Sequence, residues 1–314
     1  MTTKKTLRDL GFTETFDVEG RASIADLYKP NKRCGIYILH TSNGEHYAGQ
    51  AVDVTRRYVQ HIKNHTDIVK ISFKRVSREK LNQEEQKVIH TLEHEGLLLR
   101  NIAYASIPYG ESDFDLVMPV QEQEIWLKNL DIVGDKYKRR LVDESLRRKY
   151  RGRLASFMKK EYGNQVIDLL RSYVQLCIPA ARRGEVSFWI ISCLPQKNVY
   201  SRMNIYWQEV LTVHVYKKEL RFSIHLAESL FEKLSDKKWN ALFDKYSSLT
   251  AYAHAYEKGG SDQFNLEVSA NDFERFIRDP KVLPAIRLFN LRLMKKGACV
   301  RKNNHCLDLA DKLV

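Results

Sequence analysis

The 314-residue sequence has no long apolar run, few prolines and glycines, and few cysteines. A membrane-spanning helix needs about 20 consecutive, mostly apolar residues, so we expect no membrane span. The N-terminal segment MTTKKTLRDLGF lacks the apolar stretch of a secretory signal. The five cysteines include no Cys-x-x-Cys pair, which argues against a disulfide framework. Together these absences predict reduced thiols and a cytoplasmic location.

The composition also lacks the low-complexity tracts of a disordered chain, and 43% of the residues are hydrophobic, enough for a proper core. Positive charge is abundant: 52 Lys and Arg face 39 Asp and Glu, a formal net charge of +13. A polyanion such as nucleic acid is the natural partner of such a chain, although a merely soluble basic protein would have the same balance.

The length and the changes of pattern predict an α+β protein in three parts. Residues 1–118 alternate short strand and helix patterns, which indicates a small mixed α/β domain. Residues 119–185 form a predicted basic helical connector, in which residues 136–160 hold 11 Lys or Arg against two acids. Residues 186–314 begin with three strand-like segments, at 185–194, 202–216 and 219–226, and continue with helices near 227–247 and 283–296. We expect a second α+β domain with an antiparallel sheet there.

Three strands and two helices are predicted between residues 34 and 96. Asn43-Gly44 is a strong hairpin signal and joins two strands between residues 34 and 50. Asp53 is the expected N-cap of a helix whose apolar residues recur at four-residue intervals. Residues 67–76 alternate as a strand, and residues 81–96 form a helix that ends at Gly96.

Two triplets stand ten residues apart in the predicted hairpin, Gly35-Ile36-Tyr37 and Tyr47-Ala48-Gly49. An ordinary hairpin needs alternating apolar and polar residues and a turn, but it does not need a tyrosine and a glycine two residues apart in each strand. With the residues that follow, the triplets resemble the GIY-YIG nuclease family over about residues 35–101, in both order and approximate spacing. Ala48 departs from the usual Ile or Val of the second triplet, and we expect this to affect packing rather than chemistry. The catalytic set implied by the resemblance is Tyr37, Tyr47, Arg57, His61, Glu85 and Asn101.

The resemblance implies a role for each position. Glu85 would hold one Mg²⁺ or another hard divalent cation such as Mn²⁺, and Arg57 would bind the scissile phosphate. Tyr37 would act near the attacking water as general base or relay, assisted by Tyr47 and His61. Residue Asn101 would orient the site.

The residue types suit this chemistry, but each position has an alternative. Arg57 and His61 are four apart and share one helix face, which we expect to point away from the core. They place a phosphate-binding guanidinium beside an imidazole that titrates near neutral pH. Arg56 is the rival of Arg57, and Glu84 is the rival carboxylate. Glu85 also completes an apparent capping box with Asn82 as N-cap.

The tyrosine pair makes a geometric prediction. A simple two-residue turn at Asn43-Gly44 would pair Tyr47 with His40 and would put the tyrosines on opposite faces. A shared site requires a loop with an odd number of residues, such as three with Gly44 in the left-handed bulge position.

The basic stretch is either a solvated surface or a track for a phosphate backbone, which would give affinity without sequence reading. In the last part, the segment YSRMNIYW places Arg202 and Asn204 near two aromatics, which suits either base stacking or a sheet core. Predicted nucleic-acid contacts are Arg56, Lys138, Arg139, Arg140, Arg147, Arg148, Arg151 and Arg153.

The leading hypothesis is therefore a metal-dependent DNA endonuclease, with the C-terminal half choosing the target or controlling activity. Restriction or defence against foreign DNA would suit it, and repair and mobile-element cleavage stay open. An RNA nuclease or toxin is one alternative, and a non-catalytic nucleic-acid-binding or assembly module is another. One active site per chain means that double-strand cuts need a homodimer or two successive events.

Overall fold

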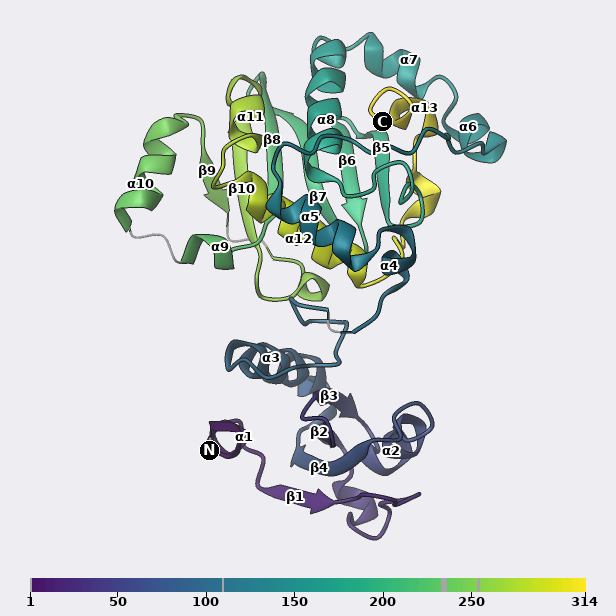
Figure 1. The fold of residues 1–314 in the computed structure, drawn as a ribbon, viewed down its shortest axis with the longest axis vertical. Helices are drawn as coiled ribbons and strands as arrows, with labels where there is room; N and C mark the ends of the chain where they lie inside the picture. Colours follow the sequence, from purple (N-terminus) through teal and green to yellow (C-terminus); the bar gives the residue numbers. More distant parts are fainter. Residues whose placement is uncertain (1, 109, 233–235, 253–254) are drawn as a thin grey trace. The chain divides into compact units, whose positions relative to one another are not determined.

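The computed structural model describes residues 2–108, 110–232, 236–252 and 255–314 (Figure 1). The chain divides into two compact units, residues 1–110 and 111–314. Each unit combines helices with an antiparallel sheet, which confirms the predicted α+β class. Within the described residues, every helix is too short or too polar to cross a bilayer.

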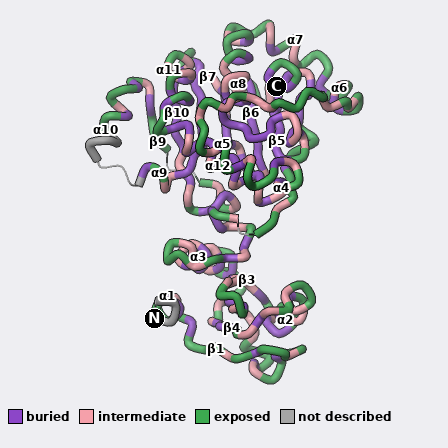
Figure 2. The backbone as a smooth tube through the Cα atoms, viewed as in Figure 1, coloured by how far each residue is buried: buried purple, intermediate pink, exposed green. Residues whose placement is uncertain are grey.

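The first unit is built on a four-stranded sheet in the order β1-β4-β2-β3. Because side chains alternate along a strand, each face of this sheet has its own apolar cluster. Ile36 and Ile38 pack toward α3, and Tyr37 and Leu39 pack toward α2. Strand β2 is buried along nearly its whole length, whereas β1, at the edge of the sheet, is mostly exposed (Figure 2). The elements are α1 (Thr2–Asp9), β1 (Glu14–Asp17), β2 (Gly35–Thr41), β3 (His46–Ala51), α2 (Val54–His61), β4 (Ile68–Arg75) and α3 (Leu81–His94).

The β2–β3 hairpin has the odd loop that the tyrosine pair requires. Thr41 pairs with Glu45 through its N–H, which leaves three loop residues, 42–44. Gly44 has a φ of +85°, the left-handed conformation expected at the bulge position. Tyr47 consequently lies opposite Leu39 and on the same face as Tyr37. The prediction of a shared face is confirmed.

The two helices of the site begin differently. Asp53 caps α2 as predicted, because its carboxylate accepts hydrogen bonds from the backbone N–H groups of Thr55 and Arg56. The predicted capping box at α3 is wrong. A 3₁₀ turn at Arg78–Lys80 precedes α3 and makes Lys80 the N-cap, so Asn82 lies inside the helix. The carboxylate of Glu85 is therefore not used in capping.

The second unit contains a six-stranded antiparallel sheet in the order β5-β6-β7-β8-β10-β9. The single strand expected over residues 202–216 is wrong, because Tyr206 adopts a φ of +53° and divides this segment into β6 and β7. The strands are β5 (Trp189–Gln196), β6 (Val199–Ile205), β7 (Gln208–Tyr216), β8 (Glu219–Leu226), β9 (Thr250–Tyr252) and β10 (Phe264–Ser269).

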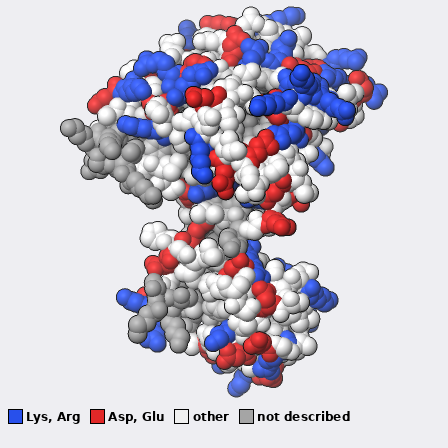
Figure 3. All heavy atoms as spheres, in the orientation of Figure 1, with Lys and Arg blue, Asp and Glu red and all other residues white. Residues whose placement is uncertain are grey.

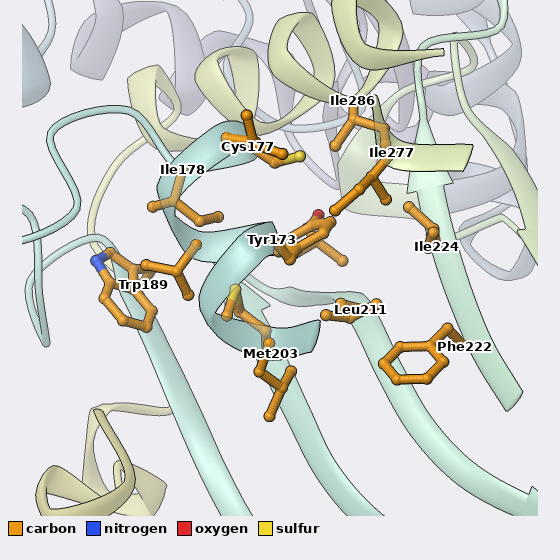
Figure 4. Packing of buried hydrophobic residues seen from close by; sticks show 14 of the residues in the cluster. Tyr173, Cys177, Ile178, Trp189, Met203, Leu211, Phe222, Ile224, Ile277 and Ile286 are labelled. Atoms are coloured by element: carbon orange, nitrogen blue, oxygen red, sulfur yellow. The ribbon is translucent and has the colours of Figure 1, made fainter. Parts of the chain in front are cut away.

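Helices cover one face of this sheet. Figure 4 shows Tyr173 and Cys177 of α8 packed above Met203, Leu211 and Phe222 of the strands. The helices of the unit are α4 (Asp113–Val117), α5 (Val120–Lys128), α6 (Glu144–Tyr150), α7 (Arg153–Met158), α8 (Gly163–Cys177), α9 (Ser229–Glu232), α10 (Asp236–Lys245), α11 (Ala270–Ile277), α12 (Leu283–Lys295) and α13 (Leu307–Ala310).

Residues 119–185 do not form a separate connector, and the boundary lies at 110/111 rather than 118/119. Trp126, Phe157 and Leu170 belong to the same apolar cluster as the sheet. Arg287 of α12 is fully buried and donates to backbone carbonyls of Trp126, Asn129, Ile132 and Leu176. It thereby satisfies carbonyls that the ends of α5 and α8 leave unpaired. Residues 135–143 are also not helical.

Candidate active site in the first unit

Each glycine of the two triplets is required by a close approach. A Cβ on Gly49 would lie 2.5 Å from the Tyr37 hydroxyl and 2.7 Å from Cζ of the same ring. A Cβ on Gly35 would lie 2.0 Å from the backbone carbonyl oxygen of Lys74. Gly49 therefore makes room for the tyrosine of the other triplet, and Gly35 allows β2 to pair closely with β4. The glycine of the second triplet is thus required by Tyr37 of the first triplet, and the glycine of the first triplet is required by the neighbouring strand.

The Tyr37 hydroxyl lies between an imidazole and a guanidinium. Its oxygen is 2.7 Å from His61 Nε2, and Arg57 Nε donates to it at 3.3 Å. The oxygen accepts from Arg57, and in the tautomer that leaves His61 Nε2 unprotonated the Tyr37 hydroxyl donates its proton to that nitrogen. Tyr37 is 1% exposed, and burial raises its pKa well above the usual value. Tyr37 is thus a neutral phenol with a proton acceptor already in place.

The expectation that His61 points away from the core is wrong. Its side chain is buried, because the helix turns this residue inward onto Tyr37 and Tyr47. Burial, with the nearby charge of Arg57, lowers the pKa of His61 to about 4. The imidazole is consequently neutral at physiological pH and can accept a proton.

Tyr47 completes an aromatic group with two histidines. Its ring centroid is 4.6 Å from that of His61 and 6.5 Å from that of His65. Arg100 fixes the adjoining loop by donating to both carboxylate oxygens of Asp67, at 2.9 and 2.6 Å, and to Glu45. The sequence analysis missed this arginine, and its only signal is its place beside Asn101.

Glu85 approaches the site from α3, on the other face of the sheet. Its side chain is mostly buried, and Oε2 accepts a hydrogen bond of 2.9 Å from Gln50 Nε2. Glu85 forms no ion pair with any described residue, and burial raises its pKa. Its charge in turn contributes to the raised pKa of Tyr37, so the two groups interact electrostatically. Gln50 was also missed, although strand alternation puts it on the same face as Ala48.

The rival residues are engaged elsewhere. Glu84 Oε2 lies 2.8 Å from Lys74 Nζ and so already has a cationic partner. Arg56 has a side chain that is 87% exposed and lies 3.8 Å from Asp53. Arg57, in contrast, reaches Tyr37. The geometry therefore favours Glu85 over Glu84 and Arg57 over Arg56.

Asn101 holds the second triplet in place through both polar atoms of its side chain. Its Nδ2 donates to Ala48 O at 2.6 Å, and its Oδ1 accepts from Ala48 N at 2.9 Å. The residue is 4% exposed. Asn101 therefore acts as a positioning residue for β3 and does not contact the tyrosine hydroxyls.

A hard divalent cation fits the residues at this site. A buried carboxylate without a cationic partner is costly, and oxygen is the ligand that Mg²⁺ and Mn²⁺ prefer. The described residues contain no group of three or more His, Cys, Asp or Glu with metal-binding geometry. Any cation here would be held by Glu85 alone among such ligands and would take its other ligands from water and phosphate, as Mg²⁺ commonly does.

The predicted nucleic-acid contacts in the second unit fall into two groups. Arg140 is paired with Glu185 and Asp311, and Arg147 lies 2.7 Å from both Asp308 and Asp311. These two arginines attach residues 136–150 to the C-terminal segment. Figure 3 shows Lys and Arg gathered over α6 and the segment before it, with acids among them. The exposed members are Lys138, Arg139, Arg148, Arg151 and Arg153.

Comparison with family models, curated proteins and solved structures returned no match for this chain.

Proposed function

We propose that the first unit is a metal-dependent endonuclease of GIY-YIG type that hydrolyses DNA phosphodiester bonds. One observation supports this most strongly. A neutral tyrosine is hydrogen-bonded to a neutral histidine and an arginine, and a buried carboxylate that forms no ion pair with a described residue lies within electrostatic reach. Phosphodiester hydrolysis needs a proton acceptor, a positive centre for the phosphorane charge and a cation ligand, and this group supplies one of each.

Each side chain has a role in this proposal. The Arg57 guanidinium, exposed beyond Tyr37, binds the scissile phosphate. The Tyr37 hydroxyl passes a proton to His61 Nε2 and so acts as a relay between the attacking water and the imidazole. Tyr47 packs against His61 and fixes its ring. Glu85 would hold a divalent cation, which would supply positive charge for the phosphate oxygens.

The test is the conversion of supercoiled plasmid to nicked and linear forms in Mg²⁺, with EDTA as a control. Glu85→Gln keeps the size and the hydrogen bond to Gln50 but removes the charge. We expect it to reduce the rate about a hundredfold or more, since a bound cation supplies several kcal/mol of stabilisation. Glu84→Gln is the matched control and should retain activity. Equal rates in the two variants would refute the site assignment.

The two alternatives separate in the same assay. An RNA nuclease would cleave a matched RNA and leave the DNA intact, since contact with a 2′-hydroxyl distinguishes the two polymers. A non-catalytic module would bind nucleic acid in a salt-dependent manner without turnover in any metal. In either case the second unit, which holds its own basic surface, would serve to select the target or control the activity.

A further inference from the structure

The sheet of the second unit has one apolar face and one polar face. The helices cover the side that carries Met203, Leu211 and Phe222. Strand pairing puts Arg202, Asn204, Thr212, Ser223, His225 and Glu267 on the opposite side, which is therefore polar across four neighbouring strands. Polar residues on central strands are unusual unless they are paired or bind something.

A hollow of about 320 Å³ lies at the β5–β6 end of the polar face. Its lining includes Arg153 from α7, Arg202 from β6 and Arg301 from the segment after α12. Glu209 is the only acidic residue among the described lining residues, so the hollow has an excess of positive charge. Three arginines that line one hollow from separate segments favour an anionic ligand, and arginine matches phosphate particularly well.

The three arginines are held to different degrees. Arg202 is fixed by Glu209 Oε1 at 3.3 Å and by Gln196 Oε1 at 2.8 Å, and its Nε is buried without a hydrogen-bond partner. The guanidinium of Arg153 lies 5.1 Å from the Tyr150 ring centroid and donates to Cys193 O. Arg301 is exposed and forms no ion pair within the described residues. The hollow thus combines preorganised donors with one free cation.

A second hollow, of about 310 Å³, adjoins the first on the same face and shares Glu209 with it. It contains no arginine among its described lining residues. It is lined by the carboxylates of Glu209 and Glu267 together with histidine, asparagine, tyrosine and hydroxyl groups. Asn204, which is 4% exposed, lines the first hollow and pairs across the strands with Glu209, the residue that the two hollows share. A ligand with a phosphate at one end and a hydrogen-bonding ring at the other matches this division.

We propose that this face is a nucleotide-binding site, in which the three arginines take the phosphate and Asn204 and the second hollow take the base. This inference does not depend on the nuclease proposal, because every residue used belongs to the second unit. The same chemistry is offered by a free nucleotide and by a nucleotide within a single strand.

The test is isothermal titration calorimetry on the full chain at about 0.15 M salt. The probes are the four deoxynucleoside monophosphates, the matching nucleosides, inorganic phosphate and a short 5′-phosphorylated single-stranded oligonucleotide. We expect at least one monophosphate to bind tighter than its nucleoside and tighter than inorganic phosphate. Stronger binding of the oligonucleotide would identify a strand as the source, and stronger binding of the monophosphate would identify the free nucleotide.

Arg301→Ala is the first variant, because this exposed side chain forms no ion pair with a described residue whose loss would affect folding. We expect about a tenfold or greater loss of nucleotide affinity, with partial recovery in Arg301→Lys. Arg278→Ala removes an exposed arginine elsewhere in the same unit and should leave binding unchanged. Asn204→Ala should weaken the monophosphate but not inorganic phosphate. Absence of nucleotide binding, or binding unaffected by Arg301→Ala and Asn204→Ala, would overturn the proposal.

Discussion

Gly49→Ala tests the relation between the two triplets directly. The new methyl group would lie 2.5 Å from the Tyr37 hydroxyl and 2.7 Å from its Cζ. The ring cannot move away easily, because Tyr37 is 1% exposed and bonded to His61. Overpacking of this kind costs about 1–3 kcal/mol, and replacing glycine recovers about 0.4–1 kcal/mol through the unfolded chain. We therefore expect a net loss of about 1–2 kcal/mol in the stability of the hairpin.

Hydrogen exchange of peptides from β2 and β3 measures this loss in the intact chain and separates the first unit from the second. A loss of about 1–2 kcal/mol corresponds to a reduction of about 5–30-fold in protection. Tyr37→Phe should recover part of it in the double variant, because the hydroxyl is the nearest clashing atom. Tyr47→Phe is the matched control and should recover nothing, since the contact of Gly49 with that residue is through a ring carbon at 3.0 Å. Unchanged protection in Gly49→Ala, or equal recovery by both phenylalanines, would refute the reasoning.

Three further predictions concern the ionisation and positioning of the site. Burial raises the pKa of Glu85, because the ionised carboxylate is destabilised in the folded state. In EDTA, Glu85→Gln should therefore raise the melting temperature at pH 7. This increase should become smaller as the pH falls toward 4.5 and the wild-type carboxylate becomes protonated. Mg²⁺ should stabilise the wild type but not this variant. The pKa of His61 is lowered to about 4, so the stability that its neutral form contributes is present above pH 6.5 and is lost as the pH falls through about 4. NMR titration of the imidazole should give a midpoint near pH 4 rather than 6.5. Asn101→Ala should leave two buried backbone groups of Ala48 unpaired and lower hairpin stability by about 2–4 kcal/mol, which exchange of β3 peptides would detect.

The sequence predicted the structure best where strand alternation allowed only one kind of hairpin loop. The requirement for both tyrosines on one face determined an odd loop, and the loop is present with Gly44 in the left-handed conformation. The position of His61 was predicted wrongly because its helix buries the polar side chain against other aromatics of the site, and helical periodicity treats such a residue as exposed.

The second unit was harder to predict for a physical reason. The turn between β6 and β7 consists of Tyr206 and Trp207, and neither is a glycine, asparagine or proline that would signal a turn. The segment 119–185 was predicted to be a separate connector because of its many charged residues. It belongs to the second unit because its apolar side chains pack in the same cluster as the sheet. Arg287 could not be identified from the sequence, because its partners are backbone carbonyls about 110 to 160 residues away.

The outer edge of β3 explains why the site needs residues as distant as Glu85 and Asn101. The backbone groups of every second residue of this edge strand point outward and must be satisfied. At His46 they bond to the backbone of residues 98 and 100, and at Ala48 both bond to the Asn101 side chain. At Gln50 the backbone N–H bonds to the Glu85 carboxylate and lowers its pKa, in opposition to burial. The outward backbone groups of β3 are thus hydrogen-bonded first by the backbone of residues 98 and 100, then by the Asn101 amide and finally by the Glu85 carboxylate. Glu85 is held at the position where the covering backbone has ended, within electrostatic reach of Tyr37 and Tyr47.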